Sequence, residues 1–456
     1  MLSIATAQTE KANEVQRLSK ALQFETVSGY DSTVFSPVVY KNFISYLKEV
    51  FPMTHQKLEF RIINEFSLLY YWKGTDPQKA PVLFLGHYDV VPAEVSTLNQ
   101  WIHSPFSGYI DNECIWGRGA IDDKFQVMSL LEATEKLLKE NFIPRQDIYF
   151  AFGHDEEIGG EHGALKIAEY LRTKNLQFAM VLDEGGVMVK GIFPGITKTI
   201  ALIATAEKGD MNIEMAVFDK GGHSSIPSEE TAIDILSKAI IKLNKHPMPA
   251  RLQDPTLEML NILSPHFDGK TRFALRHRSL FRKKILKKLS ENPGTNALIR
   301  TIISPTMLRG GSKENSLPTF AAVNLNVRIL QGDSIELVMQ YLHNITNDPR
   351  IQLTLKKPYH NASPITPSNG TAWQILSKTI KESWPDVIIS PLVAPGTTDS
   401  RHYSSLSKNI FRFIPVTVNN ESKEQIHGIN ERISIYEYQK SIQFYTELIK
   451  KINTEL

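Results

Sequence analysis

Histidine and carboxylate side chains recur along this sequence at points where short apolar stretches end. In chain order they are His87, Asp122, Glu156 with Glu157, Asp183 with Glu184, and His427. Each alone has an ordinary structural explanation, such as a helix cap for Asp122. Together they place imidazole and carboxylate ligands in the pattern of a metal site, because crowded like charges destabilise a fold unless a cation offsets them.

The neighbouring acids allow a division of labour within such a site. Glu157 can ligate a metal while Glu156 stays free to accept a proton from water. Asp89 lies two residues after His87, where a carboxylate can bind the second ring nitrogen and orient the ring toward a metal. Three carboxylates and a hydroxide would balance two divalent cations. Oxygen and nitrogen ligands without sulfur favour two zinc ions, with cobalt or manganese as possible substitutes.

Composition limits the classes of protein that this chain can belong to. With 456 residues, 42% of them apolar and 22% charged, it can bury a large core in two or three structural units. A formal net charge of +2 gives no general field that would favour nucleic acid. Cys114 is the only cysteine, which excludes an intrachain disulfide and a multi-cysteine zinc site. No apolar run reaches about 18 residues, so no membrane-spanning helix is expected.

Two segments leave alternatives open. Residues 1–8 are too short for a signal peptide but resemble the end of one, so export after signal removal and a cytoplasmic location both stay open. The one basic run is either a solvated helix face or a contact for an acidic or membrane surface. It consists of Arg272, Arg276, Arg278, Arg282, Lys283, Lys284, Lys287 and Lys288.

The apolar periodicity predicts that strands and helices alternate in the first part of the chain. Helical spacing runs through residues 13–57. Strands are expected at residues 66–72, 81–86 and 147–152, and helices at residues 124–140 and 162–173. This alternation predicts an α/β sheet with its site at the strand ends.

A second pattern begins after residue 205. Strands are expected at residues 211–218, 301–307, 320–329 and 351–356, with helices at residues 230–245 and 334–345. This β-α-β-β-α-β order is ferredoxin-like and predicts a small inserted domain. The expected domains are residues 1–206 and 358–456 for the catalytic part and 207–357 for the insert, with a basic helical extension at about 249–296.

Three motifs carry a family resemblance. They are GHYDVVP at residues 86–92, GRGAIDDK at residues 117–124 and DEEIGG at residues 155–160. The chain resembles, over nearly its whole length, the co-catalytic zinc peptidase family of aminoacylase, glutamate carboxypeptidase and carboxypeptidase S. LDEGG at 182–186, NALIRT at 296–301 and TDSR at 398–401 are most similar to the branch of carboxypeptidase S and the secreted N-fatty-acyl-amino-acid synthase/hydrolase.

The resemblance implies a fold and a ligand set. The fold is a zinc-exopeptidase-like α/β catalytic domain, with a mixed central sheet flanked by helices, plus an inserted ferredoxin-like α+β domain that serves as lid and dimerisation domain. Asp122 would bridge two zinc ions per subunit. Asp183 is preferred to Glu184 because it directly follows the apolar strand. The other ligands would be His87 with Asp183 for one zinc, and Glu157 with His427 for the other.

The resemblance also implies an activity. The chain would cleave an amide bond next to a free C-terminal carboxylate, in peptides or in N-acyl amino acids, and could run the reverse synthesis. Glu156 would be the general base, and His223 would stabilise the tetrahedral oxyanion. Arg401, with Asn315 and Arg328, would bind the substrate carboxylate. A homodimer through the insert is expected, and no nucleic acid partner. The alternative is a catalytically silent metal-binding protein, or a membrane- or lipoprotein-docking protein, of the same fold.

Overall fold

The computed structural model describes residues 4–29 and 35–456 and contains two compact units. Unit 1 comprises Met1–Thr205, Thr366–Leu392 and Thr398–Leu456, and unit 2 comprises Ala206–Ile365 and Val393–Thr397. Unit 2 contains the expected insert, extends past it to Ile365 and includes a short second segment. Residues 1–3, at the start of the segment that resembles a signal-peptide end, lie outside the described part, as do the side chains of residues 4–8.

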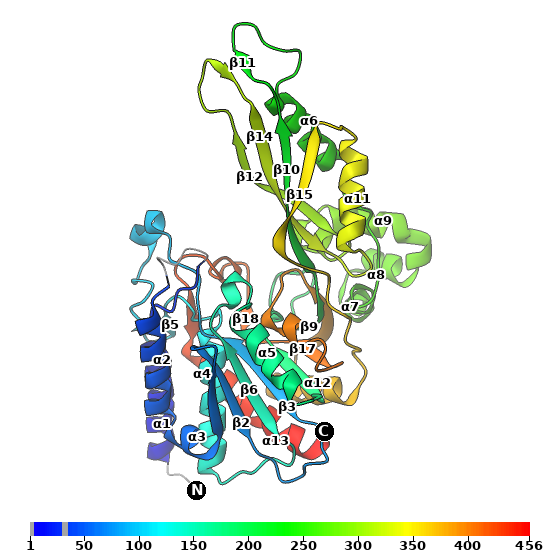
Figure 1. Cartoon of the computed structure of the whole chain (residues 1–456). Helices are drawn as coiled ribbons and strands as arrows, with labels where there is room; N and C mark the ends of the chain where they lie inside the picture. Colours follow the sequence, from blue (N-terminus) through cyan, green and yellow to red (C-terminus); the bar gives the residue numbers. More distant parts are fainter. Residues whose placement is uncertain (1–3, 30–34) are drawn as a thin grey trace. The chain divides into compact units, whose positions relative to one another are not determined.

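A mixed sheet forms the centre of unit 1 (Figure 1), as predicted. Its strands lie in the order β1 (Glu59–Ile63), β2 (Ser67–Trp72), β6 (Ile148–Gly153), β3 (Val82–His87), β7 (Met180–Asp183), β17 (Ile410–Arg412), β9 (Ile200–Glu207), β8 (Met188–Val189) and β18 (Thr417–Val418), with β16 (Ile388–Ala394) paired to β9. The strands β6, β3, β7 and β17 are parallel to one another. The neighbours β1, β2 and β9 join them in antiparallel pairs.

Helices cover both faces of this sheet because apolar side chains alternate along its strands. Phe84 packs into one core with Phe125, whereas Leu85 packs into the other with Leu171. The first core is covered by α1 (Ile4–Leu22), α2 (Pro37–Val50), α3 (Pro52–Lys57), α4 (Lys124–Lys139), α12 (Thr371–Ser383) and α13 (Ile435–Glu455). The second is covered by α5 (Ala164–Thr173) and the 3-10 helix η4 (Asp399–Tyr403).

The region predicted to be helical, residues 13–57, contains parts or all of three separate helices, α1, α2 and α3. Proline begins two of them, at Pro37 and Pro52, where its missing N–H costs no helical hydrogen bond. Short 3-10 helices occur at η1 (Val95–Gln100), η2 (Glu156–Ile158) and η5 (Ser422–Glu424). A small sheet of β4 (Tyr109–Ile110), β5 (Cys114–Trp116) and β19 (Arg432–Ser434) joins the segment before Asp122 to the segment after His427.

Unit 2 is built on a four-stranded antiparallel sheet. Its order is β12 (Ile302–Gly310), β14 (Phe320–Ile329), β10 (Gly209–Phe218) and β15 (Ile351–His360), and its core includes side chains of α6 (Ala232–Lys245) and α11 (Ile335–Thr346). The chain order of these elements is the expected β-α-β-β-α-β order. The extension contains α7 (Thr256–Leu263), η3 (Ser264–His266), α8 (Gly269–Arg276), α9 (Arg278–Ser290) and α10 (Pro293–Ala297), and β11 (Gly222–His223) pairs with β13 (Ser316–Leu317).

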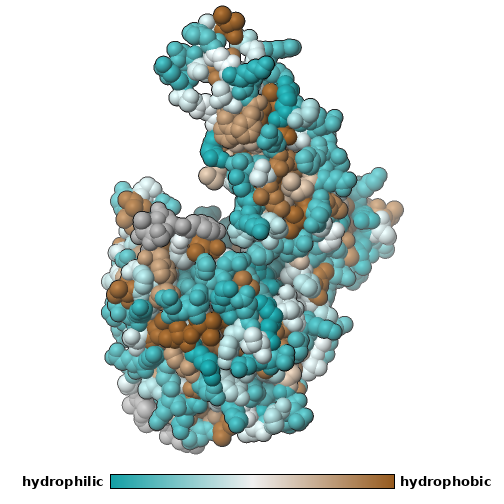
Figure 2. Space-filling view, in the orientation of Figure 1, coloured by the Kyte–Doolittle hydropathy of each residue, from teal (hydrophilic) through white to brown (hydrophobic). Residues whose placement is uncertain are grey.

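The surface is mostly polar. On the face shown in Figure 2, hydrophilic side chains predominate and hydrophobic ones gather in separate patches. Within residues 4–29 and 35–456, none of the helices combines the length and the apolar character that crossing a bilayer requires.

Candidate metal centre

The predicted site lies where parallel strands of unit 1 end. His87 is the last residue of β3 and pairs with Gly153, the last residue of β6. Glu184 follows directly after β7, which is parallel to β3. Parallel strands bring their carboxyl ends to one edge of the sheet, and ligands characteristically bind there. Side chains that are distant in the sequence therefore meet at this edge.

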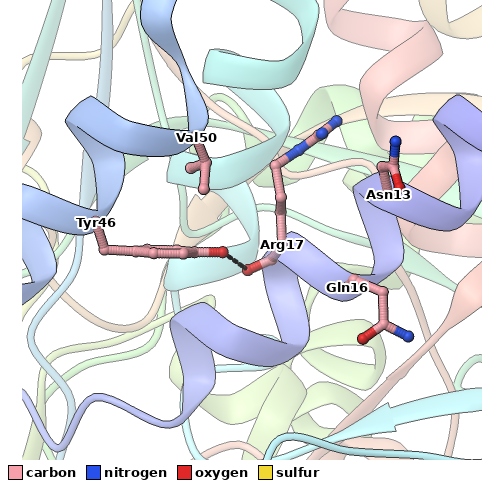
Figure 3. Close-up of a pocket in the computed structure, with 5 residues that line it drawn as sticks. All are labelled: Asn13, Gln16, Arg17, Tyr46 and Val50. Atoms are coloured by element: carbon pink, nitrogen blue, oxygen red, sulfur yellow. Dashed lines mark hydrogen bonds between the residues drawn. The ribbon is translucent and has the colours of Figure 1, made fainter.

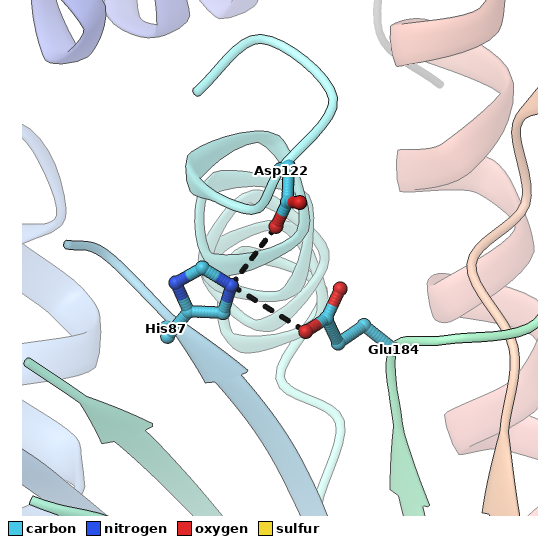
Figure 4. Close-up of side chains that lie close together, drawn as sticks. All are labelled: His87, Asp122 and Glu184. Atoms are coloured by element: carbon cyan, nitrogen blue, oxygen red, sulfur yellow. Dashed lines mark hydrogen bonds and ion pairs between the residues drawn. The ribbon is translucent and has the colours of Figure 1, made fainter. Parts of the chain in front are cut away.

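One group of possible metal ligands consists of His87, Asp122 and Glu184. Their ligand atoms lie within 4.8 Å of one another. His87 Nε2 is 3.0 Å from Asp122 Oδ1 and 3.5 Å from Glu184 Oε1. Figure 4 shows the three side chains converging from the end of a strand, the loop before α4 and the segment after β7. Two carboxylates and one imidazole suit a divalent cation such as zinc.

A second group shares Asp122 with the first. His427 Nε2 lies 3.0 Å from Asp122 Oδ2 and 3.1 Å from Glu157 Oε2. The ligand atoms of these three residues also lie within 4.8 Å of one another. The two oxygens of Asp122 therefore face two different histidines, His87 and His427, which is the arrangement that a bridging carboxylate requires.

The expected ligand Asp183 does not belong to either group. Its Oδ2 accepts a hydrogen bond of 2.8 Å from the backbone N–H of Ser400 in η4. Alternation along β7 places Asp183 on the side of Val181, which packs in the core that also contains Tyr403 of η4. Glu184, one residue later, approaches His87 instead. The geometry therefore favours Glu184, not the expected Asp183, as the carboxylate that joins His87 and Asp122.

Asp89 contacts both the His87 ring and the backbone of the turn that carries Glu156 and Glu157. Its Oδ1 is 3.3 Å from His87 Nδ1, and its side-chain oxygens accept the backbone N–H groups of Glu156 and Glu157 at 3.1 Å each. Ser28 Oγ donates to the same carboxylate at 2.5 Å. Asp89 thus orients the His87 ring and fixes the turn that carries the two glutamates.

Glu156 lies beside the two groups without joining them. Its Oε2 is 4.0 Å from His87 Nε2. Burial raises the pKa of Glu156 well above its ordinary value, and the neighbouring carboxylates of Glu184 and Asp399 raise it further. A nearby acid that is not needed as a ligand is the arrangement that a general base requires.

The electrostatics of the site fit bound cations. Burial, followed by the charge of Asp122, raises the pKa of both Glu157 and Glu184 to about 7. Hydrogen bonds to Asp122 and Glu157 raise the pKa of His427 to about 10. Glu157 Oε1 is buried and has no hydrogen-bond partner among the described residues. Positive charge at this point would relieve the repulsion and satisfy that oxygen, so the residues present fit two divalent cations.

Arg401, predicted to bind substrate, also belongs to unit 1. Its Nη2 donates to the carbonyl oxygen of Gly159, in the turn that follows Glu157. Its Nε is buried and has no hydrogen-bond partner within the described part of the chain. The guanidinium therefore lies against the turn that carries Glu156 and Glu157, and its Nε donor is not used by another described residue.

In unit 2, the structure brings two predicted residues together and separates the third. The pairing of β11 with β13 sets His223 opposite Ser316, next to Asn315, and His223 is exposed. Arg328 lies near the far end of β14, where its Nη1 is 3.4 Å from Asp210 Oδ1. The eight residue-to-residue steps from Phe320 to Arg328 span about 26 Å of strand. Arg328 therefore does not share a subsite with His223 and Asn315 within this unit.

A surface hollow elsewhere in unit 1 is less suited to chemistry (Figure 3). It is lined by Asn13, Gln16, Arg17, Tyr46 and Val50, from α1 and α2. Arg17, its only charged lining residue, is already paired with Glu132 at 2.6 Å and with Glu10 at 3.0 Å. It shares no residue with either ligand group.

Comparison with known proteins identifies the family. Residues 83–451 match peptidase family M20/M25/M40. The chain belongs to this family. It is 38% identical over 444 residues to probable carboxypeptidase S-like 2 of Dictyostelium discoideum, covering 96% of this chain and 85% of the relative. It is 35% identical over 452 residues to the N-fatty-acyl-amino acid synthase/hydrolase PM20D1 of Homo sapiens, covering 98% and 89%.

Solved structures of the family share the fold. The M20 family metallo-carboxypeptidase Sso-CP2 from Sulfolobus solfataricus superposes with a TM-score of 0.72 at 20% identity, covering 96% of this chain and 99% of that one. The YXEP protein of Bacillus subtilis, described as a dinuclear metal binding peptidase of the M20 family, gives 0.57 at 14% identity, covering 98% and 100%. The M20 chain described here is therefore a metallohydrolase, and the predicted resemblance is confirmed. The expected hydrolytic enzyme, rather than the catalytically silent alternative, agrees with these relatives.

Sequence reasoning missed two buried residues beside the site. Glu431 accepts a hydrogen bond of 2.7 Å from Arg118, a pair separated by 313 positions in the sequence. Both lie in or next to segments singled out from the sequence, but nothing in a single sequence signals that they touch. The contact follows from the pairing of β5 with β19.

Proposed function

We propose that this M20 metallohydrolase uses two zinc ions to cleave amide bonds next to a free carboxylate. Asp122 would be the ligand shared by both ions. The observation that carries the proposal is the contact of each Asp122 oxygen with a different histidine at 3.0 Å. The remaining ligands are His87 and Glu184 for one zinc, and Glu157 and His427 for the other. Cobalt or manganese can replace zinc at such sites.

The residues around the ligands supply the proton transfers. A pair of bound divalent cations would lower the pKa of water toward about 7 and polarise the amide carbonyl. Glu156 takes a proton from the attacking water and delivers it to the departing amine nitrogen. Asp89 keeps the His87 ring in the tautomer that leaves Nε2 free for the metal, because it binds Nδ1.

Substrate recognition is assigned to Arg401, His223 and Asn315. Arginine offers a planar fork that matches a carboxylate, and Arg401 lies against the Gly159 carbonyl beside the catalytic turn. In unit 2, His223 and Asn315 lie next to each other, and we propose that both act on the substrate, with His223 donating to the oxyanion. Arg328 is not retained in this group, since it lies at the other end of β14.

The substrates are proposed to be N-acyl amino acids or peptides with a free C-terminal carboxylate. The names of the relatives support this range, because one is a probable carboxypeptidase and another an N-fatty-acyl-amino acid synthase/hydrolase. Hydrolysis and synthesis share one transition state, so the same site would also condense a fatty acid with an amino acid when their concentrations are high.

The chain is also proposed to form a homodimer through unit 2. The strand β12 is at the edge of its sheet and exposes Met307 and Leu308, at 64% and 71% of their surface. An open edge with apolar side chains is a template for pairing with a second strand. The same strand of a second copy would complete it in an isologous contact.

A substrate screen tests the proposed function. Purified protein is stripped with chelator, reloaded with zinc, and offered N-acyl amino acids and dipeptides, each alongside its C-terminal amide. We expect hydrolysis only after reloading, and only of the substrates with a free carboxylate. Equal rates with chelator and with zinc would overturn the proposal that hydrolysis needs bound metal. Equal rates for an acid and its C-terminal amide would overturn the proposal that the enzyme requires a free carboxylate.

A further inference from the structure

A buried carboxylate outside both ligand groups, Glu431, links the loop before Asp122 to the segment of His427. The side chain of Glu431 is fully buried. Its Oε1 accepts the backbone N–H groups of Gly119 at 3.1 Å, Ile121 at 2.8 Å and Asp122 at 3.2 Å. Three amide hydrogens directed at one oxygen fix the loop that places Asp122.

The second oxygen of Glu431 continues the connection toward His427. Glu431 Oε2 accepts from Arg118 Nη1 at 2.7 Å, and Arg118 Nη2 donates to the carbonyl oxygen of His427 at 3.3 Å. The Arg118 guanidinium is 3% exposed and lies over the Trp101 ring at 5.5 Å. Its orientation is therefore fixed from two sides, by an ion pair and by an aromatic face.

His427 is less enclosed by the fold than His87, although its ring contacts Asp122 and Glu157. Its side chain is 53% exposed, and its backbone has a φ of 58°, in the left-handed region that side chains rarely adopt. By contrast, His87 is 1% exposed and belongs to a central strand. The two metal sites therefore differ in how their histidines are held.

We propose that Glu431 and Arg118 are positioning residues for the metal site that contains His427. Together they hold the loop before Asp122 and the backbone of His427 in one hydrogen-bonded unit, so that the two ligands keep their spacing before a cation arrives. Both ligands of this site other than Glu157 depend on the pair, whereas the other site shares only Asp122 with this loop and takes His87 and Glu184 from the ends of strands β3 and β7. The inference rests on the proposed function.

The substitution Glu431→Gln tests the inference without changing the size of the side chain. Glutamine presents an NH2 group where the wild type has an acceptor, so it opposes either Arg118 or the three backbone N–H groups. Metal-free protein is titrated with Zn2+ by calorimetry and with Co2+ by visible absorption. We expect the site of His427 to weaken by about 10–100-fold, the usual cost of losing an outer hydrogen bond to a ligand, and by more than the site of His87, which shares only Asp122 with this loop.

Glu135→Gln is the matched control. Glu135 is a buried carboxylate on α4 that accepts the backbone N–H groups of Met53 at 3.1 Å and Thr54 at 2.8 Å, and it touches no ligand of either group. It should lower thermal stability and leave both metal affinities unchanged. If E431Q behaves in the same way, Glu431 is merely structural and the inference is wrong.

A second variant covers the case in which E431Q does not fold. Arg118→Lys keeps a positive charge beside Glu431 but lacks the planar fork that reaches Glu431 and the His427 carbonyl together. We expect the larger loss at the site of His427, and wild-type affinity at both sites would overturn the inference. A wild type that binds fewer than two cations would overturn the proposed function and this inference with it. A wild type that binds two, with unchanged variants, would overturn the inference alone.

Discussion

Glu156→Gln should abolish most of the turnover without removing metal. The carboxylate lies 4.0 Å from His87 Nε2 and outside both ligand groups, so its loss removes a proton acceptor and no ligand. Glutamine has the same shape but cannot take a proton from water. The backbone N–H of residue 156 still binds Asp89, so the turn should keep its conformation.

The size of the effect follows from the role. A positioned general base contributes about 10²–10⁴ in rate, or roughly 3–5 kcal/mol of activation free energy. The reduction should appear in kcat, because Glu156 is not assigned a contact with the substrate carboxylate. KM should change little. The assay is hydrolysis of an N-acyl amino acid at saturating zinc, with the metal content of each preparation measured separately.

The neighbour Glu157 provides the matched control. Glu157→Gln changes the adjacent residue in the same way, but this side chain is 3.1 Å from His427 and belongs to a ligand group. We expect it to lose metal, and added zinc to restore part of its activity. The reasoning is refuted if Glu156→Gln keeps full turnover with two metals bound, or if it loses metal as Glu157→Gln does.

Three further predictions follow from other parts of the structure. Glu184→Gln should lower the affinity for one cation, as metal titration would show. Asp183→Asn should leave both affinities unchanged and lower the melting temperature, as calorimetry would show. The opposite result would restore Asp183 as the ligand. Burial lowers the pKa of Lys208 to about 7, so the unfolded chain, with a lysine pKa of 10.5, binds more protons between these values and stability rises with pH there. Lys208 should contribute about 3 kcal/mol to the rise in unfolding free energy from pH 7 to about 9.5, and Lys208→Met should remove this share while that of Lys124, whose pKa burial also lowers to about 7, remains. An equal rise in both proteins, measured by urea unfolding, would contradict the burial argument. Replacing Met307 and Leu308 together by aspartate should convert a dimer into a monomer in light scattering, and an unchanged mass would exclude the β12 edge as the interface.

The regular elements could be predicted because their patterns are local. The strand expected at residues 320–329 is found as Phe320–Ile329, and the helix expected from Lys124 ends one residue earlier than predicted, at Lys139. Most predicted ligand residues also come together in the structure, because polar residues after an apolar strand lie at the sheet edge. His87 and Glu157 belong to this class.

Two features of the site could not be predicted. In one, a shift of a single residue along the strand decides which carboxylate is the ligand, and in the other the geometry depends on a contact between distant segments. Asp183 and Glu184 are chemically similar neighbours, and only the alternation along β7 assigns one to η4 and the other to His87. The pair Arg118 and Glu431 depends on two segments that meet through the small sheet of β4, β5 and β19. A single sequence contains the residues but not this pairing.

The two halves of the metal centre differ in how the fold supports them, and this difference predicts an order of events. His87 is 1% exposed at the end of a central strand, so its position is established when the sheet of unit 1 forms. His427 is 53% exposed and comes from the last thirty residues of the chain, where Arg118 and Glu431 must first dock it. Metal affinity that depends on a docked loop includes the free energy of docking, so the site of His427 should be the weaker and more readily exchanged of the two. A cation bound there would in turn stabilise the docked loop, so that zinc should slow the exchange of the backbone N–H groups around His427.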